Sequence, residues 1–227
     1  MTYSTYTRMY PRIAMSIETS GLGDNDKIIF VSLIGINVHI NMWLDVDCDI
    51  SDEVFDIIGI SREQYEELDK ISIADAELKL SHLFREISDL NAVVATMNIP
   101  FVFKMFSSTF NSSKDMLSNV MFFDILQYDK IFWSKRKHHS FKALKDEYDS
   151  DYKKTFAIRD IAQKQYSEIG NVLSIESVSS KMMMNAFYEM QQQRKRSFDQ
   201  GKPFNDSAIN IIEHEIEWLD KNAKKQI

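Results

Sequence analysis

Residues 13–21 read IAMSIETSG, and this stretch indicates how the chain is organised. It begins as an apolar run of strand length and ends in Ser-Ile-Glu-Thr, with Ser20 and Gly21 favouring a turn directly afterwards. Two further β-branched and apolar runs follow at residues 27–36 and 38–46, separated by Gly, Asn and Asp. The first strand is predicted at residues 12–18. Together the three runs predict three sequential strands that form a meander.

Helical periodicity follows the third predicted strand. Residues 61–70 begin with a Ser at a capping position, and residues 72–89 place apolar side chains on one helical face. Strand character returns at residues 91–97 and 119–126, a helix is predicted at 103–110, and the chain is mostly helical from residue 140 onward. Strands at intervals with helices between and after them predict an α/β layer architecture.

The overall composition is that of a globular protein. The chain has 227 residues, 44% hydrophobic and 27% charged, enough for one cored domain with an elaboration. It has no run of about 18 apolar residues and no apolar N-terminal leader, so we expect a cytoplasmic location and no membrane partner. The single Cys48 excludes an internal disulfide and a multi-cysteine zinc site. A net charge of −7 predicts that any nucleic-acid binding depends on local patches.

The C-terminal region differs in pattern from the rest. Residues 171–197 carry an apolar stripe at helical spacing, rich in Met, and residues 207–220 carry a second one. Between them, Gly201 and Pro203 favour a break. We therefore expect a main domain at residues 1–170 and a helical extension at 171–227 that packs on it.

Three short stretches suggest a chemistry. They read SIET at 16–19, MNIPFVFKMF at 97–106 and FAIRDIA at 156–162. In this order and context they resemble the three motifs of the DEDD superfamily of 3'-5' exonucleases: Asp-x-Glu, Asn-x-x-Phe-Asp and Tyr-x-x-x-Asp. That family includes polymerase proofreading domains and ribonuclease D. The resemblance covers about residues 10–170 and implies a ribonuclease H-like α/β fold, with a mixed sheet whose first three strands are antiparallel and flanking helices.

The resemblance also implies which ligands are missing. Such enzymes hold two divalent cations with about four carboxylates. Ser16 stands where the family has the metal-bridging Asp, whereas Glu18 keeps the Glu of the first motif. In the second motif Asn98 matches, but Val102 occupies the Asp position.

The third motif retains half of its pattern. Phe156 replaces the Tyr that orients the attacking water in one family branch, and Asp160 matches the last carboxylate. A branch with a His five residues before the Asp would use residues near 174–184, where neither an imidazole nor a carboxylate stands at the required places. Only Glu18 and Asp160 survive, so any Mg²⁺ or Mn²⁺ site that they form is weak.

A basic stretch offers a separate contact for nucleic acid. Residues 133–140 read WSKRKHHS and combine an aromatic ring with cations, a combination that suits single strands. The residues predicted to bind are Trp133, Lys135, Arg136, Lys137, His138 and His139. A solvated helix end is the alternative interpretation.

The acidic residues 45–53 resemble a calcium loop, but Ile50 replaces its turn Gly, so we expect a surface turn.

The sequence therefore predicts a catalytically degenerate relative of the exonuclease fold. We expect it to bind single-stranded nucleic acid or a protein partner within a replication, transcription or RNA-processing complex, without a cofactor. Two alternatives stay open: a divergent active exonuclease that uses Mg²⁺ or Mn²⁺, and a pure protein-interaction module. Few Gly and Pro with many Lys, Asn, Ile and Asp also fit a rapidly diverging viral protein, which would place it in a host cytoplasm.

Overall fold

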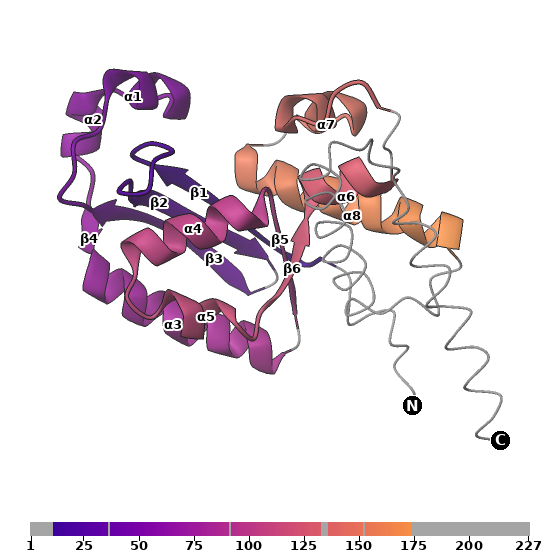
Figure 1. Cartoon of the computed structure of the whole chain (residues 1–227), viewed down its shortest axis with the longest axis horizontal. Helices are drawn as coiled ribbons and strands as arrows, with labels where there is room; N and C mark the ends of the chain where they lie inside the picture. The colour runs from indigo at the N-terminus through magenta and orange to yellow at the C-terminus, as the bar shows by residue number, and fades with distance from the viewer. Residues whose placement is uncertain (1–10, 36, 91, 133–135, 152, 174–227) are drawn as a thin grey trace, which may run out of the picture.

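The computed structural model describes residues 11–35, 37–90, 92–132, 136–151 and 153–173 (Figure 1). Within them a six-stranded mixed sheet has the order β4-β3-β2-β1-β5-β6. The strands are β1 (Ile13–Thr19), β2 (Ile28–Gly35), β3 (Val38–Asp45), β4 (Lys70–Ser72), β5 (Val93–Thr96) and β6 (Met121–Asp124). Strands β1, β2 and β3 pair antiparallel, whereas β5 pairs parallel with both β1 and β6. The predicted meander and mixed sheet are confirmed.

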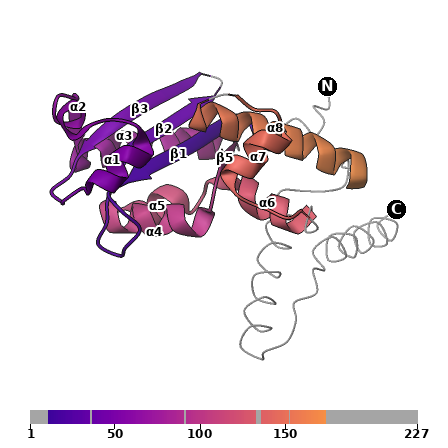
Figure 2. The same cartoon turned by 90° about the horizontal axis from the view of Figure 1, so that it is seen from above.

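Helices cover both faces of this sheet (Figures 1 and 2). They are α1 (Asp52–Ile58), α2 (Arg62–Glu66), α3 (Ile73–Asp89), α4 (Ile99–Thr109), α5 (Ser113–Leu117), α6 (Ile125–Phe132), α7 (Phe141–Glu147) and α8 (Lys154–Leu173). Helices α3, α4 and α5 share one apolar cluster, and α6, α7 and α8 share another on the opposite face. The ribonuclease H-like α/β architecture predicted from the sequence is therefore the one observed.

The alternation of side chains along β1 explains its central place. Ile13, Met15 and Ile17 contribute to the cluster with α3 and α4, while Ala14 contributes to the cluster with α8. Because successive strand residues point to opposite faces, Ser16 lies on the same side as Ala14, facing α8. A polar residue of the first motif is thus directed toward the last helix of the described chain.

Two helices begin at a shared carboxylate. Asp124, at the end of β6, is 1% exposed and accepts backbone N–H groups from Asn98 and Ile99 at the start of α4, at 3.0 and 2.7 Å. It also accepts the N–H groups of Leu126 and Gln127 in α6, at 3.1 and 3.2 Å. Burial raises the pKa of the Asp124 carboxyl, and these four donors act in the opposite direction. One side chain therefore accepts two N–H groups at each of the two helix starts.

Some expectations meet the structure only in part. The acidic stretch 45–53 leaves β3 as a turn and then enters α1 at Asp52, a helix that we did not predict. Helix α8 continues through residue 170 to Leu173, across the boundary expected between the two parts of the chain. From residue 174 onward, the extension lies outside the described residues. Among the described helices, none combines the length and apolar character that a membrane span requires.

We predict that Asp124→Asn lowers the free energy of unfolding by about 2–4 kcal/mol, because a carboxamide nitrogen would face backbone N–H donors that then lack an acceptor. Urea denaturation at neutral pH measures this. Asp56→Asn is the matched control, since Asp56 is exposed on α1 and should change stability by less than about 0.5 kcal/mol. Equal stability of the two variants would contradict the shared-cap interpretation.

Candidate functional site

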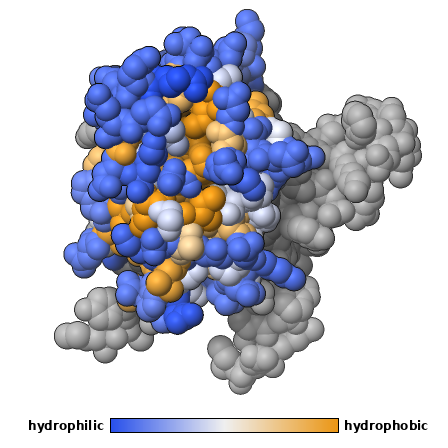
Figure 3. All heavy atoms as spheres, turned by 90° about the vertical axis from the view of Figure 1, so that its left-hand side faces the viewer, coloured by the Kyte–Doolittle hydropathy of each residue, from blue (hydrophilic) through white to orange (hydrophobic). Residues whose placement is uncertain are grey.

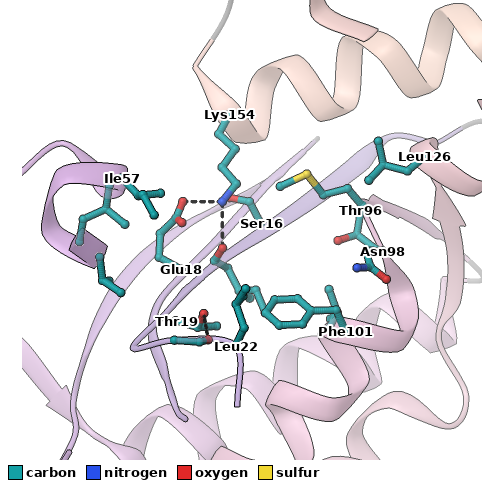
Figure 4. A pocket seen from close by; sticks show the side chains of 16 residues that line it. Ser16, Glu18, Thr19, Leu22, Ile57, Thr96, Asn98, Phe101, Leu126 and Lys154 are labelled. Carbon is teal, nitrogen blue, oxygen red and sulfur yellow. Dashed lines mark hydrogen bonds and ion pairs between the residues drawn. The ribbon is translucent and has the colours of Figure 1, made fainter. Parts of the chain in front are cut away.

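A cleft opens where β1 and β5 end side by side, because these strands run parallel. Its volume is about 470 Å³. Side chains from β1, the loop after it, α1, the β5–α4 junction, α6 and α8 surround it (Figure 4). The lining consists of Ser16, Ile17, Glu18, Thr19, Gly21, Leu22, Val54, Ile57, Ile58, Thr96, Met97, Asn98, Phe101, Val102, Leu126 and Lys154.

The β1 side of the cleft has its polar groups paired. Ser16 is 3% exposed, and its hydroxyl lies 2.7 Å from that of Thr155, the second residue of α8. The register with β2 shifts between Glu18 and Thr19, an irregularity that redirects side chains at the strand end. Glu18 accepts a hydrogen bond of 2.7 Å from Lys154 Nζ. The same ammonium donates to the Ile17 carbonyl at 3.1 Å (Figure 4).

The β5–α4 side of the cleft is mostly apolar. Asn98 has a left-handed backbone, with φ of 58°, a conformation that Asn tolerates better than most residues. Its carboxamide and the Phe101 ring lie at the cleft (Figure 4). Val102 is 2% exposed and belongs to the main apolar cluster, so its methyl groups stabilise the core at the position where the exonuclease pattern has an Asp.

The rim of the cleft exposes two large aliphatic side chains. Leu22, in the loop after β1, is 76% exposed, and Ile57, on α1, is 81% exposed. On the side of the molecule that carries α1 and α2, apolar side chains gather in a band between hydrophilic ones (Figure 3). The apolar lining of the cleft therefore continues to solvent at its rim.

Hydrogen bonds hold the loop that carries Leu22. The Asp26 carboxylate accepts from Ser20 Oγ at 3.0 Å and from Gly23 N at 2.5 Å. A Cβ at Gly21 would come within 2.5 Å of that carboxylate, so a larger residue there would displace the Asp26 side chain. From α4, Lys104 donates to the Leu22 carbonyl at 2.9 Å, and its hydrogen bond and charge lower the pKa of Asp24. The loop is thus attached to α4, and both of its carboxylates are engaged.

The third predicted motif does not converge on the cleft. Asp160 pairs with Lys164 at 3.0 Å one turn further along α8, and Phe156 lies under the Arg159 guanidinium. Neither residue is part of the lining. At 100° per residue, position 160 lies on a different face of α8 from positions 154 and 155. The α8 residues at the cleft are therefore Lys154 and, through Ser16, Thr155, instead of the pair expected from the motif.

The described residues do not fit the pair of divalent cations that an exonuclease fold implies. Glu18 is the one acidic side chain among the described residues that line the cleft, and it is already paired with an ammonium. Nowhere in the described parts of the chain do three His, Cys, Asp or Glu side chains form a group suited to a metal. Divalent cations of this kind need several oxygen ligands, so we derive no chemical step through a metal.

The basic stretch is partly directed inward. Asp129, fully buried on α6, accepts from Arg136 Nη1 and lies 2.5 Å from His139 Nδ1. Arg136 also donates to Glu147 at 3.0 Å. Arg136 and His139 are about one-fifth exposed and both contact Asp129, so they position this segment. Their contact with nucleic acid stays a prediction. Of the other predicted residues, Lys137 and His138 are exposed, and Trp133 and Lys135 lie outside the described residues.

Comparison with solved structures fits this geometry. A 3'-exonuclease studied for 3'-end specific recognition of histone mRNA stem-loop superposes with a TM-score of 0.50 at 14% identity, over 70% of this chain. A moderately thermophilic Exonuclease I from Methylocaldum szegediense superposes with a TM-score of 0.52 at 14% identity, over 82% of this chain. The chain has the ribonuclease H-like fold of these exonucleases.

These likenesses establish the exonuclease fold alone. The chain spans 65% of the first structure's length and 44% of the second's. No family model and no curated protein matches the sequence. What the cleft does must therefore be argued from its own residues.

Four residues that shape the site were not predicted from the sequence. Lys154 and Thr155 carry no motif, and their role appears only when the start of α8 meets β1. Leu22 follows Gly21 in an expected turn, and only the structure places its exposed side chain at the cleft. Ile57 lies on a helix that was not predicted.

We predict that Asp129→Asn lowers the free energy of unfolding by about 3 kcal/mol, because it removes the buried carboxylate that pairs with Arg136 and His139 and leaves the guanidinium only the more exposed Glu147. Thermal and urea unfolding measure this loss. Asp146→Asn, on the exposed side of α7, removes the same charge as a control and should have little effect. A wild-type stability for Asp129→Asn would refute the positioning role.

Proposed function

We propose that the chain holds the end of a single-stranded nucleic acid in the cleft without hydrolysing it, as a component of a replication, transcription or RNA-processing complex. The observation that carries this proposal is an open, mostly apolar cleft in an exonuclease fold. At this cleft, Ser16 and Val102 occupy positions where the family pattern has metal-binding carboxylates.

The lining suits an unstacked base. A volume of about 470 Å³ falls in the range of about 300–1,000 Å³ that holds small ligands. Phe101, Leu22 and Ile57 offer apolar surface for the flat face of a base, and the Asn98 carboxamide can both donate to and accept from a base edge. A fold neighbour described for 3'-end recognition of an mRNA stem-loop supports this choice of ligand.

The small number of negative charges in the cleft disfavours metal-dependent hydrolysis. A two-metal mechanism concentrates several carboxylates on two cations, whereas this cleft offers Glu18 alone, neutralised by Lys154. The Ser16 hydroxyl is bonded to Thr155 and is itself a poor ligand for a hard cation. We infer that a strand placed here stays intact.

A second contact at the basic segment extends the proposal. Lys137 and His138 are exposed. Arg136 and His139, which flank them in the sequence, are both held by the buried Asp129. Because the whole chain carries a charge of −7, binding must depend on such local cations.

The first experiment follows 5'-labelled single-stranded DNA and RNA with the purified protein in Mn²⁺, on denaturing and native gels in parallel. We expect an intact oligonucleotide and a shifted native band. Shortening from the 3' end that disappears in Glu18→Gln would instead identify a divergent exonuclease. An unshifted band at low salt would favour a protein-interaction module, for which the exposed Leu22 and Ile57 would be the contact residues.

We predict that Leu22→Ser weakens single-strand binding about tenfold, near the lower end of the roughly 1.5–3 kcal/mol that burial of a leucine side chain against a ligand contributes. Fluorescence anisotropy of a labelled oligonucleotide measures this effect. Leu90→Ser is the matched control, because Leu90 is also 76% exposed but lies at the end of α3, away from the cleft lining. Equal affinities of the two variants would place the strand elsewhere.

A further inference from the structure

The Lys154 ammonium stands among the oxygen atoms at the end of β1. Its Nζ atom lies 2.7 Å from Glu18 Oε1 and 3.1 Å from the Ile17 carbonyl oxygen. The Lys154 side chain is 31% exposed and lines the cleft (Figure 4). An ammonium has three N–H donors, so these two contacts leave one for a ligand in the cleft.

This lysine competes directly with a metal. A dication bound to Glu18 would have to displace the ammonium, and two positive groups would then share a single carboxylate. The neighbouring positions offer no compensation, because Ser16 is bonded to Thr155 and Val102 is packed in the core. Lys154 already neutralises the charge of Glu18. Adding a dication would leave the cleft with excess positive charge, which disfavours metal binding.

We propose that Lys154 takes the place of the divalent cation in this exonuclease fold, and that its remaining N–H binds a phosphate oxygen of the strand without any metal. This rests on the proposed function for the identity of the ligand, but the exclusion of metal stands independently. The ammonium is a point charge on a flexible stem, which suits a single phosphate contact. The cleft would therefore bind its strand equally well in EDTA and in Mn²⁺.

The binding test uses Lys154→Met, with Lys153→Met as the matched control, since Lys153 is exposed next to it and does not line the cleft. Anisotropy titrations of a single-stranded oligonucleotide run over a series of salt concentrations in EDTA. Loss of one charge-assisted hydrogen bond should weaken binding by Lys154→Met roughly tenfold. The slope of log K against log salt should become shallower by about 0.7, as expected for one single-strand phosphate contact.

The metal test uses electron paramagnetic resonance of Mn²⁺, which reports bound ion whether or not nucleic acid binds. The wild-type protein should leave Mn²⁺ free, and a double variant with Ser16→Asp and Lys154→Met should bind it, because two carboxylates then face the cleft without the ammonium. Circular dichroism checks that both proteins are folded.

The outcomes separate this inference from the proposed function. Tight Mn²⁺ binding by the wild-type protein, lost in Glu18→Gln, would overturn the metal exclusion even if the strand binds. Wild-type affinity and salt slope in Lys154→Met would overturn the phosphate contact while leaving the strand-holding function intact. Absence of strand binding by the wild-type protein would reject the function, and the resonance experiment would still decide the role of Lys154.

Discussion

The Asp124 carboxylate is the constraint on which much of the molecule depends. It accepts four backbone N–H groups, two at the start of α4 and two at the start of α6, from a nearly fully buried position at the end of β6. Helix α4 brings Asn98 and Phe101 to the cleft, and α6 brings Leu126. A single buried acceptor therefore sets the directions of two walls, because an unsatisfied helix start in this position would be costly.

The chemistry of the cleft follows from how its polar groups are used. Ser16 is bonded to Thr155, and Glu18 is bonded to Lys154, so the polar atoms at the end of β1 are satisfied within the protein. The remaining surface is largely apolar and reaches the rim at Leu22 and Ile57. The described lining has one carboxylate and a largely apolar surface, which is why retention of a strand is the function we propose.

Sequence patterns predicted the scaffold better than the site. The three strands of the meander, the Ser61 cap of α2 and the apolar face of α3 follow from local periodicity and capping, which depend on neighbouring residues. Asp160 was assigned to the cleft by a short motif, but helical rotation turns it toward Lys164. Arg136 and His139 were assigned to a ligand as surface cations, since nothing nearby in the sequence reveals that the buried Asp129 lies between them.

By itself, the sequence determined the antiparallel meander and the apolar face of α3, because each of these is a property of residue type and local spacing. It also shows Ser16 and Val102 where the resemblance to the exonucleases implies carboxylates. Only the tertiary structure decided what stands in their place. Lys154 and Glu18 are 136 residues apart, and Ser16 and Thr155 are 139 apart, so both pairs form only when α8 packs on β1. Contacts over such separations depend on the packing of the whole sheet and leave no local pattern from which they could be predicted.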